Sequence, residues 1–107
     1  MSDIADLKHI AKFKLLLCDQ IDKSNLRLLS YNEIMIVLAI ADLSGSDGCL
    51  ASDVHNHKLL RGISRPTIQR SVASLKALNL IEPCGGVTNR RYMLNMAGLK
   101  DYGSNSL

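Results

Sequence analysis

The chain has 107 residues, of which 47% are hydrophobic and only 4% aromatic, and its net charge is +3. This length fits one domain, and the hydrophobic fraction is too high for a disordered protein. Because tryptophan is absent and phenylalanine occurs once, the core must consist of aliphatic side chains, which favours packed helices over a sandwich of aromatic-rich strands.

An amphipathic helix is predicted over residues 3–22, where apolar side chains recur at intervals of three and four. Further apolar residues lie off this stripe, so the apolar surface is wider than one face needs. We therefore expect one side of the helix to pack on its own domain and the other on a second copy of the chain, although exposed apolar side chains also occur on monomers. The residues expected in this homodimer contact are Leu7, Ile10, Phe13, Leu16 and Leu17.

Two more helices are predicted in the next part of the chain. Ser30 and Glu33 match a capping box, in which the serine hydroxyl accepts a free amide and the glutamate reaches back, and this opens a helix over about 31–43. After a glycine-containing loop, a short helix is expected over about 51–59, with Val54 pointing inward.

A fourth helix, over about 65–78, has two different sides. Ser64 caps it, and Pro66 occupies its first turn, where a missing amide hydrogen is harmless. The apolar side consists of Ile68, Val72 and Leu75. The opposite side is small and polar with one arginine, Arg70, so it has the character of a helix face that enters a groove.

A β-hairpin and a last short helix follow. One strand starts at Leu80, Gly85 and Gly86 make the turn, and residues 91–94 return as the second strand. The last helix is expected over about 96–102.

The order of these elements predicts a winged helix-turn-helix, a mainly α fold with a small β-hairpin. Residues 1–107 would form one such domain. Its parts are an N-terminal helix over 1–24 that dimerises, a helix-turn-helix core over 31–82, a wing over 80–95 and a polar tail over 103–107 that is expected to be disordered.

Charge is divided unevenly between the two halves of the chain. Residues 1–53 have a net charge of −3, whereas residues 54–100 have a net charge of +7 and Glu82 as their one acidic residue. A surface that faces phosphate groups must exclude carboxylates, so the second half is typical of a nucleic-acid contact, although charges also segregate on solvated surfaces.

Two segments resemble MarR-type winged-helix regulators. Residues 63–81, ISRPTIQRSVASLKALNLI, are similar to the family's recognition-helix segment, and residues 89–95, NRRYMLN, are similar to its basic wing strand. Residues 28–41 resemble the family's second helix, and Gly98 lies at the expected place after the wing. The resemblance covers about residues 10–100 and implies a winged helix that binds double-stranded DNA.

The sequence also departs from that family. Asn79 stands where members have glycine, the segment 55–62 is longer than usual, and the wing is short. The long C-terminal helices through which members dimerise are absent. In size the chain is therefore more similar to short SarA-like regulators and to the DNA-binding adaptors of tubulin-like plasmid partition systems.

The resemblance implies DNA contacts from the fourth helix, the turn before it and the wing. The implied DNA-binding residues are Arg61, Ser64, Arg65, Thr67, Gln69, Arg70, Asn89, Arg90 and Arg91. Two alternatives stay open for the wing: Arg91 pairs with Glu82 across the hairpin, or Arg90 is simply solvated.

No pattern in the sequence indicates catalysis. Cys18, Cys49 and Cys84 are odd in number and far apart, which argues against a disulfide framework or a zinc site, indicates a reducing compartment and favours packing over redox sensing. The tripeptide at residues 55–57 reads HNH, but it does not match the spread of the nuclease motif, so surface histidines are expected there. Neither a signal peptide nor a membrane span is indicated. We expect a cytoplasmic protein that has no enzymatic activity, metal or cofactor.

Three functions are compatible with these features. The first is a sequence-specific transcriptional regulator that binds double-stranded DNA as a homodimer, with or without a small-molecule effector. The second is a centromere-binding adaptor of a plasmid or phage partition system, and the third is a winged helix used only for protein interaction. The acid-free recognition segment, beside a wing with Arg90 and Arg91, favours the two DNA-binding functions over the third.

Overall fold

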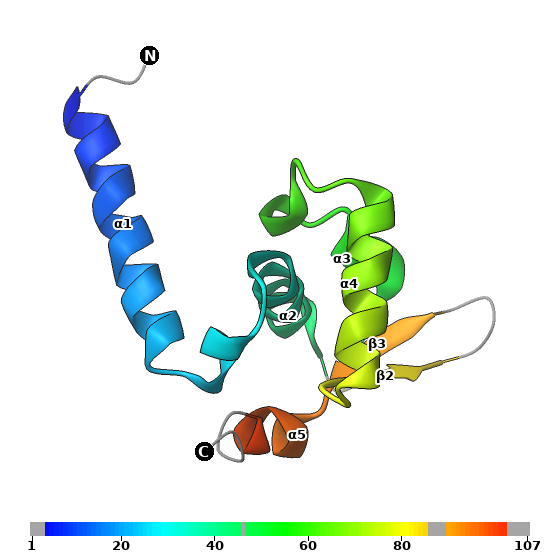
Figure 1. The fold of residues 1–107 in the computed structure, drawn as a ribbon. Coiled ribbons are helices and arrows are strands. Elements are labelled where there is room, and N and C mark those ends of the chain that lie inside the picture. The colour runs from blue at the N-terminus through cyan, green and yellow to red at the C-terminus, as the bar shows by residue number, and fades with distance from the viewer. Residues whose placement is uncertain (1–3, 46, 86–89, 103–107) are drawn as a thin grey trace.

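The computed structural model describes residues 4–45, 47–85 and 90–102, and these residues are mainly helical (Figure 1). The elements in chain order are α1 (Ile4–Asp22), η1 (Asn25–Leu28), α2 (Tyr31–Leu43), β1 (Cys49–Leu50), α3 (Ala51–His55), η2 (Lys58–Leu60), α4 (Arg65–Ala77), β2 (Ile81–Cys84), β3 (Arg91–Leu94) and α5 (Met96–Asp101), where η denotes a 3-10 helix. The predicted fold class, mainly α with a small β-structure, is confirmed at this level. The predicted tail over 103–107 lies outside the described residues.

The core is built around α2. Ile36, Ala39 and Ile40 have no exposed surface, and α4, η2 and β3 pack on this helix. The capping box at its start is confirmed: the backbone N–H of Ser30 donates to Glu33 Oε1 at 2.9 Å, and the backbone N–H of Glu33 donates to Ser30 Oγ at 3.3 Å. The helix therefore begins where the sequence predicts.

A three-stranded antiparallel sheet flanks the helices, with strand order β1-β3-β2. The predicted hairpin is confirmed by the pairing of Ile81 with Leu94, which aligns β2 with β3. The expectation of a hairpin alone is wrong, because β1 pairs with the other side of β3 through Cys49 and Tyr92. As a result β3 is the central strand.

The helix predicted over 51–59 is also wrong as a single element. Here α3 ends at His55, Val54 points inward as predicted with no exposed surface, and the chain continues as the separate turn η2. His57 is the reason, because its Nδ1 accepts the backbone N–H of Leu59 at 3.0 Å while its Nε2 lies 2.7 Å from Asp42 Oδ2. These contacts hold His57 in an extended conformation that a continuous helix does not allow.

The helix α4 is close to its predicted bounds, and Ser64 caps it as expected. Its predicted apolar side, Ile68, Val72 and Leu75, is buried. The helix ends in a Schellman motif, in which the N–H of Leu80 donates to the carbonyl of Leu75 and Asn79 takes a left-handed conformation with φ of 60°. The family to which this segment shows resemblance has glycine at that position, which suits the same geometry.

The helix α1 stands apart from the rest of the molecule in Figure 1 and buries none of its residues. The expectation that one of its sides packs on its own domain is therefore wrong. The chain turns at η1 and α1 projects away from the body, so that Ile21, near the C-terminal end of α1, packs against the core. In the described part of the chain, neither α1 nor any other helix has the length and apolar character required to cross a membrane.

Candidate nucleic-acid interface

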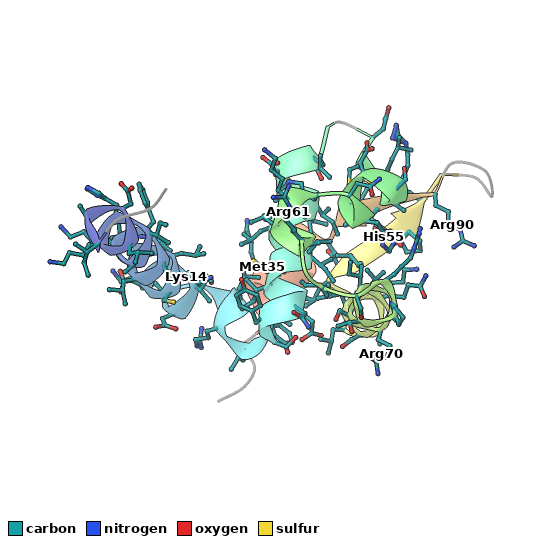
Figure 2. All side chains as sticks on the ribbon, turned by 90° about the horizontal axis from the view of Figure 1, so that it is seen from above. Lys14, Met35, His55, Arg61, Arg70 and Arg90 are labelled. Carbon is teal, nitrogen blue, oxygen red and sulfur yellow. The ribbon has the colours of Figure 1, made fainter. Side chains whose placement is uncertain are left out.

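The outward side of α4 is polar and has no acidic residue of its own. Arg70 is exposed opposite the buried apolar side of this helix, and Gln69 is exposed on its flank. Figure 2 shows Arg70 pointing away from the molecule. The segment from residue 54 to residue 81 contains no acidic residue, and Glu33 of α2 reaches this helix through a hydrogen bond from Ser74.

The start of α4 positions three of the predicted DNA-binding residues. Ser64 Oγ accepts the backbone N–H of Thr67 at 3.4 Å and lies 2.8 Å from Thr67 Oγ1. Both hydroxyl groups are therefore engaged in capping the helix, and Thr67 is half-buried. Arg65 is exposed at the first helical position, beside backbone amides that favour an anion.

Arg61 is exposed in the turn that leads into α4. It caps η2, and its backbone N–H donates to the carbonyl of Lys58 at 3.1 Å. Gly62 follows with φ of 88°, a left-handed conformation that suits glycine. The turn therefore fixes the direction in which the chain enters α4, and it leaves the Arg61 side chain in solvent.

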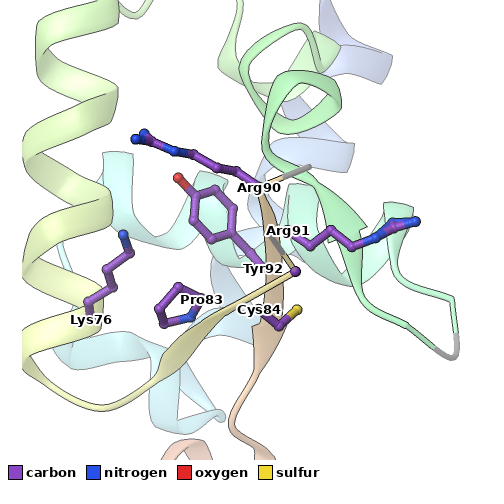
Figure 3. A pocket seen from close by; sticks show the side chains of 7 residues that line it. Lys76, Pro83, Cys84, Arg90, Arg91 and Tyr92 are labelled. Carbon is purple, nitrogen blue, oxygen red and sulfur yellow. The ribbon is translucent and has the colours of Figure 1, made fainter. Parts of the chain in front are cut away.

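The wing places its two described arginines on different sides of the sheet. Arg90 is exposed just before β3, and Arg91 is half-buried inside the strand (Figure 3). The alternative pairing of Arg91 with Glu82 is wrong, because no ion pair joins these two described residues, which lie diagonally across the strands rather than directly opposite each other. Asn89, the third predicted wing residue, lies outside the described residues.

Two residues near this surface were missed by the sequence analysis. Lys76, on the last turn of α4, has its Nζ 5.4 Å from the centre of the Tyr92 ring. Tyr92 is 7% exposed and packs in the core. Lys76 belongs to the acid-free segment, so the sequence contained a signal that could have indicated it. The position of Tyr92 depends on strand register, for which the sequence contained no signal.

The histidines of α3 and η2 have separate roles. His57 pairs with Asp42, as described above. Burial, and to a lesser extent the charge of Arg65, lowers the pKa of His55, so this ring stays neutral at physiological pH. Within the described ranges, histidine, cysteine and acidic residues form no group of three that could hold a metal ion.

The three thiols are unpaired and lie in different environments. Cys49 is buried, Cys84 is half-buried and Cys18 is exposed on α1. Burial raises the pKa of the Cys49 thiol, and this effect outweighs the hydrogen bonds that oppose it. A protonated, buried thiol is a poor nucleophile, which agrees with a packing role for this residue.

The predicted dimer contact residues lie together on α1, away from the core. Leu7, Ile10, Phe13 and Leu16 are exposed by 55%, 58%, 74% and 62%, and Leu17 is half-buried. These apolar side chains form a surface that winds around α1, since Leu7 and Leu16 lie on opposite sides of the helix. Such exposure of large apolar side chains is typical of a contact surface.

Comparison of the chain with models of known families, with curated proteins and with solved structures finds no match. The resemblance to MarR-type regulators therefore stays a prediction that rests on the two sequence segments given above.

Proposed function

We propose that this protein is a winged helix-turn-helix transcriptional regulator that binds double-stranded DNA as a homodimer. In this proposal α4 is the recognition helix in the major groove, and the turn between β2 and β3 is the wing. The major groove of B-DNA admits one α-helix, and an adjacent hairpin can reach the neighbouring backbone.

The outward side of α4 is the observation on which the proposal depends. This helix buries its apolar side on α2 and exposes Gln69 and Arg70, and it contains no acidic residue itself. Arginine and glutamine are the side chains that make two hydrogen bonds at once to guanine and adenine edges. An exposed helix with these groups has the composition of a base-reading element.

The order of the elements also supports the proposal. Three helices, α2, α3 and α4, precede the β2–β3 hairpin, and β1 closes the sheet between α2 and α3. In a winged helix a second helix precedes the recognition helix and braces it, and α3 precedes α4 in the chain. Arg90 then stands at the wing strand, where a cation can contact a phosphate.

The homodimer is proposed to form through α1. The apolar residues of this helix are uncovered within the described chain, and a second copy offers the same patch in a two-fold contact. A second apolar surface, a groove of about 340 Å³, lies near the C-terminal end of α1. It is lined mainly by Leu26, Leu38, Leu94, Met96 and Leu99. In the dimer this groove extends the contact to α5.

The proposal is tested by selecting duplexes from a random library with the full chain, then measuring affinity by fluorescence anisotropy. Arg70→Ala is expected to weaken binding to the selected duplex by roughly 1–3 kcal/mol, because one base contact is lost. Arg27→Ala is the matched control, since Arg27 is an exposed arginine on η1, outside α4 and the sheet. Failure to enrich any duplex would overturn the proposed function.

The same selected duplex separates regulation from plasmid or phage partition. Binding of one palindrome by one dimer supports the regulator, because two-fold symmetry in the protein matches two-fold symmetry in the site. Cooperative coating of repeated sites, observed by footprinting, would instead favour a partition adaptor.

A further inference from the structure

A basic cavity of about 530 Å³ lies between the end of α4 and the sheet (Figure 3). It is lined by Lys76, Pro83, Cys84, Gly85, Arg90, Arg91 and Tyr92. Three of these side chains are cations and none of the described lining residues is acidic. A concave surface with this charge attracts an anion.

Only some of the side chains that line the cavity lie on the same side of the sheet. In Figure 3 the Lys76 amine, the Arg90 guanidinium and the Tyr92 hydroxyl all lie on the side of the sheet that faces α4. Arg91 and Cys84 point to the opposite side. These two residues pair across the strands next to the pair of Tyr92 and Pro83, and successive residues of a strand point to opposite faces. The polar part of the cavity that faces α4 therefore has two cations and one hydroxyl group.

The backbone beneath these three groups is held firmly. Tyr92 sits on the central strand, paired with Cys49 on one side and with Pro83 on the other. The carbonyl of Arg90 accepts the backbone N–H of Ala51 at 2.9 Å, so the residue is tied to the start of α3. These ties fix the backbone from which the Arg90 and Tyr92 side chains extend.

The donors suit a phosphate group. Arginine and lysine bind phosphate oxygens through charge-assisted hydrogen bonds, and a phenol donates one more. Burial raises the pKa of Tyr92, and this outweighs the opposite effect of the Arg90 charge. The hydroxyl therefore keeps its proton at neutral pH and can act as a donor.

We propose that Lys76, Arg90 and the Tyr92 hydroxyl together bind one phosphate group. For the source of that phosphate the inference rests on the proposed function, in which it belongs to the DNA backbone next to the groove occupied by α4. Lys76 lies on the same flank of α4 as Arg65 and Gln69, since these positions are separated by four and seven residues. A phosphate held there fixes the register of α4 on the duplex without reading a base.

The first experiment measures the site without DNA. Inorganic phosphate and pyrophosphate are titrated into the full chain, and the amide signals of residues 76, 90 and 92 are followed by NMR. Saturable shifts are expected, with affinity at least fivefold weaker in Lys76→Gln, Arg90→Gln and Tyr92→Phe. Arg27→Gln, which removes the same charge from η1, is expected to bind as the wild type does, and circular dichroism verifies that each variant is folded.

The second experiment measures the slope of log affinity against log salt concentration on a duplex. Lys76→Gln is expected to reduce this slope by about one for each copy of the site, because one phosphate contact is lost. If the slope is unchanged but the variants lose inorganic phosphate, the site binds a free phosphate compound. If neither measurement changes, the proposed site is wrong. If the wild type binds no duplex, the proposed function fails and the titration still decides the site.

Discussion

Asn79 illustrates how one backbone angle ends α4. Its φ of 60° allows the Schellman hydrogen bonds that stop α4, and its carbonyl accepts Asn95 Nδ2 at 2.7 Å. The same carbonyl lies 2.5 Å from the place where a Cβ on Gly98 would stand, so only glycine fits at that position of α5. Asn79 and Gly98 therefore allow the end of α4 to pack closely against α5.

Asn79→Val is expected to lower the free energy of unfolding by about 1–2 kcal/mol, because a β-branched side chain is strained at positive φ. Asn79→Gly is the matched control and should be as stable as the wild type or more stable. Urea unfolding followed by circular dichroism measures both variants. Equal stability of the valine and glycine variants would contradict the left-handed assignment.

Glu33 links the start of α2 to α4. Its Oε2 accepts the hydroxyl of Ser74 at 2.7 Å, in addition to the capping box with Ser30. Burial alone raises the pKa of this carboxyl group, but the hydrogen bonds from Ser30 and Ser74 outweigh it, and the net pKa lies below the ordinary value of 4.5. The ionised carboxylate is therefore more stable in the folded protein than in the unfolded chain.

The sign of this shift predicts a pH dependence. The stability contributed by ionised Glu33 is fully present above its unfolded pKa and is lost as the pH falls through the lower folded pKa. Glu33→Gln is expected to be less stable than the wild type by roughly 0.5–1.5 kcal/mol at neutral pH. The difference should shrink on acidification below about pH 4.5. Urea midpoints at several pH values measure this, and a constant difference would contradict the role of the charge.

Some of the candidate site was predictable at the level of residues, and some was not. The Ser64 cap and the exposure of Arg70 follow from helical periodicity, which is local and needs no knowledge of neighbours. The direction of Arg91 and the place of Tyr92 depend on which residues lie opposite them in the sheet. A single sequence does not contain that register, so the pairing of Arg91 with Glu82 could not be excluded beforehand.

At the level of elements, α1 is the most unusual part of the molecule. A helix of 19 residues that buries nothing is marginal in water by itself, because helix formation without packing gains little free energy. In the proposed homodimer, association would supply the packing that this helix lacks.

The double substitution Leu7→Glu with Phe13→Glu is expected to yield a monomer, since two charges would be placed in the centre of the apolar patch. Lys12→Glu is the control, because it changes the charge of the same helix outside the five predicted contact residues. Sedimentation equilibrium gives the oligomeric state. The monomeric variant should also lose helical signal equivalent to α1, and a dimer that survives the double substitution would exclude this helix as the contact.

The elements that were missed are short or depend on distant partners. The strand β1 has two residues, too few for an alternating pattern, and it exists because β3 pairs with it. The break after α3 depends on the contact between His57 and Asp42, which are 15 positions apart. The long helices α2 and α4 were predicted well because their caps and periodicity agree.

The whole molecule is extended, and its charge is polarised along the sequence. Its radius of gyration is 15.2 Å, larger than the roughly 13 Å expected for a compact chain of this length, because α1 projects from the body. The basic residues lie mainly in the second half of the sequence, which contains α4, β2 and β3, whereas the first half is acidic overall. In the proposed function, the duplex binds the basic half.

This polarity predicts a strong salt dependence of DNA binding. With about six phosphate contacts per dimer, affinity should fall on the order of a thousandfold between about 50 and about 200 mM salt. Fluorescence anisotropy on a fixed duplex across this range measures the effect. A flat response would mean that phosphate contacts contribute little, and the charge division between the two halves would then have no part in binding.

The central position of β3 has a consequence for synthesis of the protein. Its two neighbours are both made earlier, β1 at residues 49–50 and β2 at residues 81–84, whereas β3 follows at residues 91–94. Neither neighbour has a strand partner until β3 has left the ribosome, so the sheet cannot form before this last strand is made. The nascent chain can therefore form α2 and α4 before its sheet.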